Sequence, residues 1–217
     1  MGLARIELFF VLALAAISAG GAVAQDHNDR AHSQARPFAP DDARTLSEFA
    51  KCVAMRKPLQ ARALLDMDNR TAAYQRALIH LTQISGDCGL AGDMRFNADL
   101  FAGGLAEGLL QARFQPGDLA AHVALDTTRP PIPSRDEAEL MNLCVVRSAP
   151  GEVAALLRTE PSSAPETVAL RSIVPHLAPC LRGGVSVNVD RLMLRASLAL
   201  AAYRLSDYNG FALAATR

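Results

Sequence analysis

Aromatic side chains and net charge are both scarce in this sequence. It has no tryptophan, aromatic residues make up 5% of its 217 positions, and 22 basic residues are balanced by 22 acidic ones. Aromatic platforms on which bases or sugars could stack are therefore not expected. The balanced charge also argues against a nucleic-acid partner held by bulk electrostatic attraction.

Motifs of known catalytic chemistry are missing as well. The chain has no GxSxG elbow, no HExxH or SxxK motif, no glycine-rich phosphate loop and no CxxC pair. The histidines are isolated in sequence, and no Cys/His cluster has the spacing of metal ligands. We therefore predict no catalytic residue, no cofactor and no metal site.

The N-terminal segment has the pattern of a secretory signal peptide. Arg5 precedes an apolar run from Leu8 to Ala19, and the small residues Ala22-Val23-Ala24 follow. The run is shorter than the roughly 20 residues that span a bilayer, and no other stretch is long and apolar enough to do so. We expect cleavage near Ala24 and a periplasmic or secreted chain with no transmembrane segment.

Four cysteines reveal an internal repeat. Cys52 and Cys88 have the same separation as Cys144 and Cys180, and the two pairs are offset by 92 positions (144 − 52). At this offset six of the fifteen residues from 52 to 66 are identical, including the two prolines Pro58 and Pro150. Self-similarity at a fixed period predicts a duplicated structural unit.

The duplication favours one disulfide pairing. An even number of cysteines in an exported chain suggests disulfides, and four cysteines allow three pairings. In a single ancestral unit the two cysteines had only each other as partners. We therefore favour Cys52 with Cys88 and Cys144 with Cys180, while the other two pairings stay open.

Helical periodicity divides the chain into two similar halves. We predict an all-α fold of two tandem, pseudo-symmetric repeats of about four helices each, with one internal disulfide per repeat. The expected organisation is a signal peptide over 1–24, a polar lead-in over 25–40, repeat 1 over 41–114, a linker over 115–135, repeat 2 over 136–205 and a tail over 206–217. A short helix is expected inside the linker.

The fourth helix of each repeat is rich in small residues. It is predicted from Asn97 to about Phe114 in repeat 1 and from Asn188 to about Leu205 in repeat 2. Small side chains let helices approach closely, so we expect these two helices to form the central layer. Asn97 and Asn188 are predicted to be their N-caps, with Asp99 and Asp190 in the first turn. In repeat 1 the segment Asp68-Asn69 is predicted to cap the third helix.

The repeated motif resembles that of a family of uncharacterised exported alphaproteobacterial proteins. The residues that carry the likeness are Cys52-Val53, Pro58, Leu64-Leu65 and Cys88, followed by Cys144-Val145, Pro150, Leu156-Leu157 and Cys180-Leu181. In repeat 1, Gly89 stands where the family pattern has the leucine seen at Leu181. The resemblance implies an exported helical protein and no particular activity.

Tandem helical units often present extended binding surfaces. We therefore predict a non-enzymatic module that binds or scaffolds another protein or polypeptide. A carrier of an apolar small molecule or lipid is the alternative, because disulfide-linked helices around small-residue seams can enclose a cavity. An enzyme with an unrecognised site is a third possibility, and it would need several titratable groups that converge in one cleft.

Overall fold

All regular elements in the described part of the chain are helices. The computed structural model describes residues 39–89, 96–115, 117–124, 128, 132–181 and 190–214, with side chains up to Tyr208. No strand occurs within these ranges, which belong to the unit Phe38–Arg217. The predicted signal peptide and most of the lead-in lie outside them. The helices are α1 (Pro40–Arg56), α2 (Pro58–Leu65), α3 (Ala72–Gln83), the 3-10 helix η1 (Gly86–Cys88), α4 (Ala98–Arg113), α5 (Asp118–Val123), α6 (Glu137–Ser148), α7 (Pro150–Leu156), α8 (Ala164–Cys180) and α9 (Arg191–Ala214).

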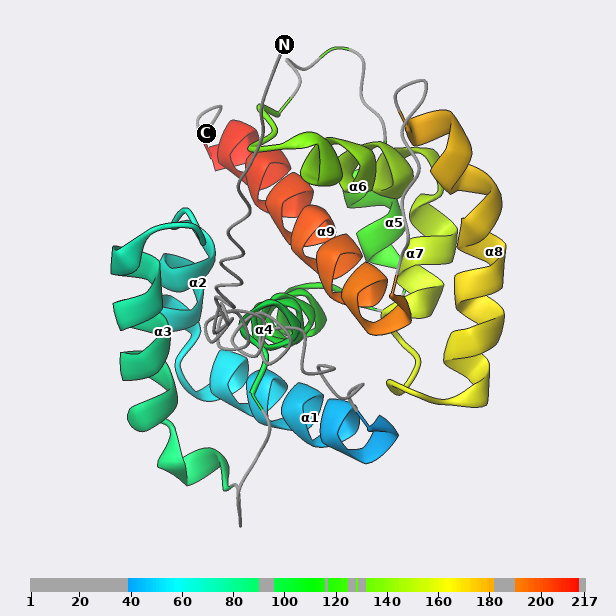
Figure 1. Cartoon of the computed structure of the whole chain (residues 1–217). Helices are drawn as coiled ribbons and strands as arrows, with labels where there is room; N and C mark the ends of the chain where they lie inside the picture. Colours follow the sequence, from blue (N-terminus) through cyan, green and yellow to red (C-terminus); the bar gives the residue numbers. More distant parts are fainter. Residues whose placement is uncertain are drawn as a thin grey trace, which may run out of the picture. The chain divides into compact units, whose positions relative to one another are not determined.

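Helices α4 and α9 pack against each other at the centre, as the small residues of the two predicted fourth helices indicate. A Cβ atom on Gly103 would lie 2.5 Å from the Cα and Cβ atoms of Ala196, so the helices cross with almost no side chain between them. Helix α1 packs on α4, and α6 packs on α9. Figure 1 shows α1 and α6 on opposite sides of the central pair.

The contact between α1 and α4 is especially close. Cβ atoms added to Gly104 and Gly108 would lie 2.6 and 2.7 Å from the Cβ atoms of Ala50 and Ala54. Two glycines and two alanines at the contact thus let the two helix backbones approach each other. The free energy that two glycines cost in a helix interior, about 1 kcal/mol each, is offset by this packing.

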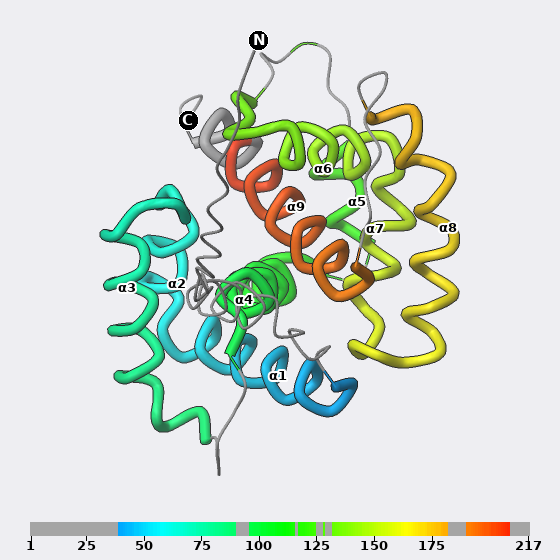
Figure 2. Tube along the Cα trace, viewed as in Figure 1, coloured from blue at the N-terminus to red at the C-terminus, as the bar shows by residue number. Residues whose placement is uncertain are grey.

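The outer helices are tied to the centre by the two predicted disulfides. Cys52 of α1 is bonded to Cys88 at the end of η1, and Cys144 of α6 is bonded to Cys180 at the end of α8, with Cα–Cα distances of 5.7 and 5.6 Å. The pairing predicted from the duplication is therefore confirmed. Figure 2 shows α2 and α3 on one flank of the central pair and α7 and α8 on the other.

The predicted cap of the third helix needs correction. The N-cap of α3 is Thr71, whose hydroxyl accepts a hydrogen bond from the Tyr74 amide. Asp68 instead accepts hydrogen bonds from the backbone and side chain of Arg70 in the preceding turn, and Asn69 lies in the same turn. The Asp68 carboxylate stabilises the turn that leads into α3, so the helix begins later than predicted.

The caps of the two central helices differ from each other. Asn97 precedes α4 and accepts hydrogen bonds from the amides of Asp99 and Leu100. Asn188 lies outside the described residues. The side chain that caps α9 is Asp190, which accepts from the amides of Leu192 and Met193 at 2.9 and 3.1 Å. Asp190 is thus the cap itself and not a residue of the first turn.

Two helices extend past their predicted ends. The sequence predicts the third helix of repeat 2 from Ala164 to about His176, but α8 continues through Pro175 and Pro179 to the disulfide at Cys180. Helix α9 likewise continues past Leu205 to Ala214. In α9, Ser206 bonds back to the carbonyl of Tyr203, and Asp207 pairs with Arg113 of α4. These contacts hold polar residues in a helix that their sequence predicts to be a tail. The linker contains α5, near the short helix predicted there.

None of the helices in the described ranges is both long and apolar enough to cross a membrane.

Candidate binding cavity

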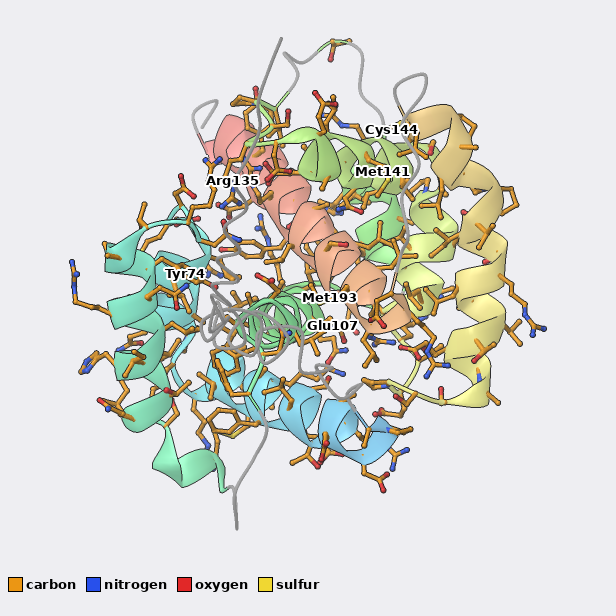
Figure 3. The ribbon with its side chains drawn as sticks, in the orientation of Figure 1. Tyr74, Glu107, Arg135, Met141, Cys144 and Met193 are labelled. Carbon is orange, nitrogen blue, oxygen red and sulfur yellow. A yellow bond between two sulfur atoms is a disulfide. The ribbon has the colours of Figure 1, made fainter. Side chains whose placement is uncertain are left out.

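A cavity of about 240 Å³ lies beside the central helices. Its inner wall comes from α4 and α9, and α6, α3 and the end of α2 complete it. Figure 3 shows three of its residues on different elements, with Tyr74 on α3, Met193 on α9 and Arg135 just before α6. The apolar part of the lining is Leu65, Met67, Ala102, Ala138, Met193, Ala196, Leu200 and Ala201, and the polar part is Asn69, Tyr74, Asp99, Arg135, Asp136, Glu139, Asn142 and Ser197.

One buried polar atom in this lining has no hydrogen-bond partner. Asn142 of α6 is 5% exposed, and its side-chain oxygen is unpaired within the described structure. A buried polar atom without a partner costs roughly 1–3 kcal/mol. Such a group in a cavity wall marks a place where a hydrogen-bond donor from a ligand would be stabilised.

Tyr74 contributes a phenol to the same lining. Burial raises the pKa of Tyr74 to about 12, and the negative charge of Asp99 raises it as well, while Arg135 acts in the opposite direction. The phenol is therefore protonated at any physiological pH. Tyr74 thus lines the cavity as a neutral side chain that is 3% exposed.

An ion-pair cluster stands at the polar side of the cavity. Glu139 accepts hydrogen bonds from the backbone amide and side chain of Arg135 and from the side chain of Arg204 on α9. Arg135 also donates to the carbonyl of Met67 at 3.1 Å. These bonds join α6 to α9 and to the end of α2, so they fix the walls of the cavity.

A second set of charges is buried on the opposite side of the central helices. Arg195 of α9 forms two parallel hydrogen bonds with Glu107 of α4, at 2.7 Å from Nε and 2.9 Å from Nη2. Its Nη1 also donates to Glu166 of α8 at 3.2 Å. The three side chains are 4%, 3% and 0% exposed in that order.

Every part of the Arg195 guanidinium is engaged. Besides the two carboxylates, it donates to the carbonyl of Leu156 and to both the hydroxyl and the carbonyl of Thr159. Burial would lower the pKa of Arg195, but its hydrogen bonds and charge interactions with Glu107 and Glu166 outweigh burial and raise it. The arginine thus remains charged and ties α4, α7, α8 and α9 together.

Two more cations complete this buried cluster. Lys51 of α1 lies 3.2 Å from Glu107, and Arg191 lies 3.6 Å from Glu166. The remaining oxygen of Glu166 accepts from the Ser162 amide, and Ser163 caps the same helix. With all its charges paired, the cluster is a structural link between helices.

The sequence does not predict either the cavity or the buried charge cluster as a site. Glu107 is the single charged residue between Asp99 and Arg113 of an otherwise apolar helix, and Ser163 and Glu166 have the spacing of a capping box. These signals indicate buried or capping roles for single residues. They do not indicate that Glu107, Glu166 and Arg195 meet, because the three come from different helices.

Metal-binding groups do not converge in the described part of the chain. No cluster of three or more His, Cys, Asp or Glu side chains could hold a metal ion there, and the four cysteines are all in disulfides.

Comparison of the chain with models of protein families, with curated proteins and with solved structures finds no match.

Proposed function

We propose that this chain is an exported, non-enzymatic helical-repeat protein that binds a segment of another polypeptide. The observation that carries the proposal is the cavity of about 240 Å³ between α3, α4, α6 and α9. It combines an apolar wall with an unpaired buried acceptor on Asn142. An apolar surface supplies affinity, and a few fixed polar groups supply selectivity.

The size of the cavity favours a peptide side chain over a larger ligand. Pockets for drug-sized molecules usually enclose roughly 300–1,000 Å³, and this one is below that range. Three carboxylates, Asp99, Asp136 and Glu139, also line it, and an acyl chain or sterol would gain nothing from them. A carrier of an apolar molecule or lipid therefore remains the second candidate.

The duplication is part of this proposal, and the backbone supports it. The joint between α1 and α2 at Lys57 has φ −133° and ψ 56°, and the joint between α6 and α7 at Ala149 has φ −134° and ψ 54°. The caps Thr71 and Ser163 each accept a hydrogen bond from the third amide that follows. Both pairs are separated by 92 positions, as the cysteines are.

Export is proposed from the N-terminal pattern and from the two disulfides, which persist mainly in oxidising compartments. The resemblance to an exported alphaproteobacterial family also stays a proposal. Mass measurement of the protein recovered from the periplasm or medium tests export. We expect a chain that begins at Gln25, and retention of the intact N-terminus in the cytoplasm would contradict it.

Peptide display tests the proposed binding activity. Peptides selected on the disulfide-bonded protein should lose at least tenfold in affinity when Ala102→Met places a larger side chain in the cavity. Ala112→Met is the matched control, because Ala112 lies on the exposed face of the same helix. Selected peptides that bind the Ala102 variant as well as the wild type, or the absence of any selected peptide, would overturn the proposal.

A further inference from the structure

The two halves of the molecule also correspond in their central helices. Asn97 and Asp190 cap α4 and α9, which sets an offset of 93 positions (190 − 97) for these helices. At the same offset Gly103 corresponds to Ala196, and these two residues contact each other. Contact between equivalent residues is expected where two copies meet on a two-fold axis. The connection before α9 is thus one residue longer than the one before α4.

With this register, the cavity has a counterpart in the other half of the molecule. A pocket of about 30 Å³ lies against α1, α4 and α9. Its residues Ala43, Leu46 and Gly104 correspond to Arg135, Ala138 and Ser197 of the larger cavity. The pocket at this position is therefore almost filled between α1, α4 and α9, and it is open between α6, α4 and α9.

The side chain that fills the smaller pocket is Arg195. Its counterpart in the open cavity is Ala102, and Arg195 and Ala102 each line their own pocket. The partners of Arg195 are replaced too, because Leu200 corresponds to Glu107 and Tyr74 corresponds to Glu166. The position from which the Arg195 side chain extends in one half of the molecule therefore carries only the methyl group of Ala102 in the other half.

The spacing of the helices adds to the difference in volume. Gly104 lies against Ala50, whereas the corresponding positions in the other half are Ser197 and Asn142. These side chains are larger, and the contact between α6 and α9 is less extensive than that between α1 and α4. The wall of the open cavity thus stands further from α9.

The charges of the open cavity favour a cation. Asp99, Asp136 and Glu139 line it together with one cation, Arg135. Arg135 and Arg204 both pair with Glu139. Arg135 donates to the Met67 carbonyl, the counterpart of the Thr159 carbonyl that Arg195 binds. The backbone acceptor at that position is therefore already paired with Arg135, so a bound guanidinium would use the other polar groups of the lining.

We propose that the cavity binds the guanidinium group of an arginine side chain supplied by the partner polypeptide, in the place that Arg195 occupies in the other half. This inference rests on the proposed function and names its ligand. The aliphatic stem would lie along Leu65, Met193 and Leu200, as arginine stems do on apolar surfaces. The head would donate to the unpaired Asn142 oxygen, near Asp99 and the Tyr74 ring.

Titration with blocked amino acids tests the inference on the intact protein. N-acetyl-arginine amide is added to isotope-labelled protein and followed by NMR, with N-acetyl-citrulline amide as the neutral control of nearly the same shape. A single side chain gives weak binding, so millimolar concentrations are needed. We expect at least tenfold tighter binding of the arginine compound, with shifts concentrated at Asn142, Ala102 and Ala196. Equal binding of the two compounds, or shifts elsewhere, would overturn the inference.

Two sets of variants separate recognition from folding. Asn142→Leu removes the acceptor, and Asp99→Asn with Asp136→Asn removes two charges while it keeps an amide side chain that can cap α6. Each should weaken arginine binding at least fivefold with an otherwise native spectrum. Asp42→Asn with Asp118→Asn is the matched control, because these acids lie in the first turns of α1 and α5 and outside the cavity lining, and it should change nothing. Unchanged affinity in both cavity variants would contradict the site.

The outcomes distinguish this inference from the proposed function. Display peptides that bind at the cavity without enrichment in arginine would overturn the inference and leave the proposed function standing. Free agmatine that binds while an Ala-Arg-Ala peptide does not would point to a small-molecule ligand and would also overturn it. Selective binding of N-acetyl-arginine amide without binding of any peptide would contradict the proposed function and the polypeptide source of the arginine, and would leave only a guanidinium site.

Discussion

Arg195 shows how one residue decides the character of a whole site. Two charges removed from water are costly unless each is paired and hydrogen-bonded. Arg195 meets that condition through Glu107, Glu166, Thr159 and the carbonyl of Leu156. In the proposed register, Ala102 corresponds to Arg195 and Leu200 corresponds to Glu107. The open cavity therefore lacks both the buried cation and the carboxylate that would pair with it.

Substitution of this arginine should be strongly destabilising. Arg195→Met leaves Glu107 and Glu166 buried without their main partner, so we expect the free energy of unfolding to fall by about 3–5 kcal/mol. Denaturant titration measures the change. Arg113→Met is the matched control, because its pair with Asp207 is one-third exposed on both sides and should contribute about 0–1 kcal/mol. Similar losses for the two variants would contradict the role of Arg195.

Individual residues were predictable where a local rule governs them. Asn97 has the local pattern of an N-cap, and the cysteine spacing identifies the two disulfides through the repeat. Asp68 follows a local rule as well, but its carboxylate accepts hydrogen bonds within the turn, and Thr71 is the residue that caps the helix. Competition between adjacent polar residues for one capping position is decided by backbone geometry, which the sequence pattern does not contain.

At the scale of helices, the small residues of α4 set the distances between elements. The predicted central layer follows from them, since only close packing compensates for glycine in a helix interior. The end of α8 beyond His176 and the polar end of α9 are not predicted by the same reasoning. In both cases a tertiary contact lies in the part of the helix beyond its predicted end. The contact in α8 is the disulfide at Cys180, and the contact in α9 is the ion pair between Asp207 and Arg113.

Gly103 is the most sensitive point of this packing. The Cβ atom of Gly103→Ala would lie 2.5 Å from the backbone of Ala196, so we expect a loss of about 1–3 kcal/mol in the free energy of unfolding. Gly151→Ala is the control, because no atom lies within 4 Å of its Cβ position and alanine favours helix by about 1 kcal/mol. Thermal melting of the two variants gives the comparison. A melting temperature for Gly103→Ala at or above that of the wild type would contradict the close crossing.

At the scale of the whole molecule, the proposed duplication implies two halves of similar backbone with different interiors. The sequence predicts the all-α fold, the disulfides and the central helices, because the cysteine spacing and the segments rich in small residues each occur twice in it. It does not predict the cavity, because the cavity arises where the halves differ. Ala102 and Arg195 become comparable only with the offset of 93 positions, which the cap at Asp190 and the contact of Gly103 with Ala196 reveal.

The central claim is that the open cavity is the vacant counterpart of the Arg195 site. A double-mutant cycle with Ala102→Arg and Leu200→Glu tests it most directly, by measurement of the free energy of unfolding of the wild type, both single variants and the double variant. We predict that each single variant is destabilised and that the two substitutions stabilise each other by at least about 1 kcal/mol, with loss of arginine binding. Additive effects of the two substitutions, or a double variant that still binds N-acetyl-arginine amide, would contradict the account.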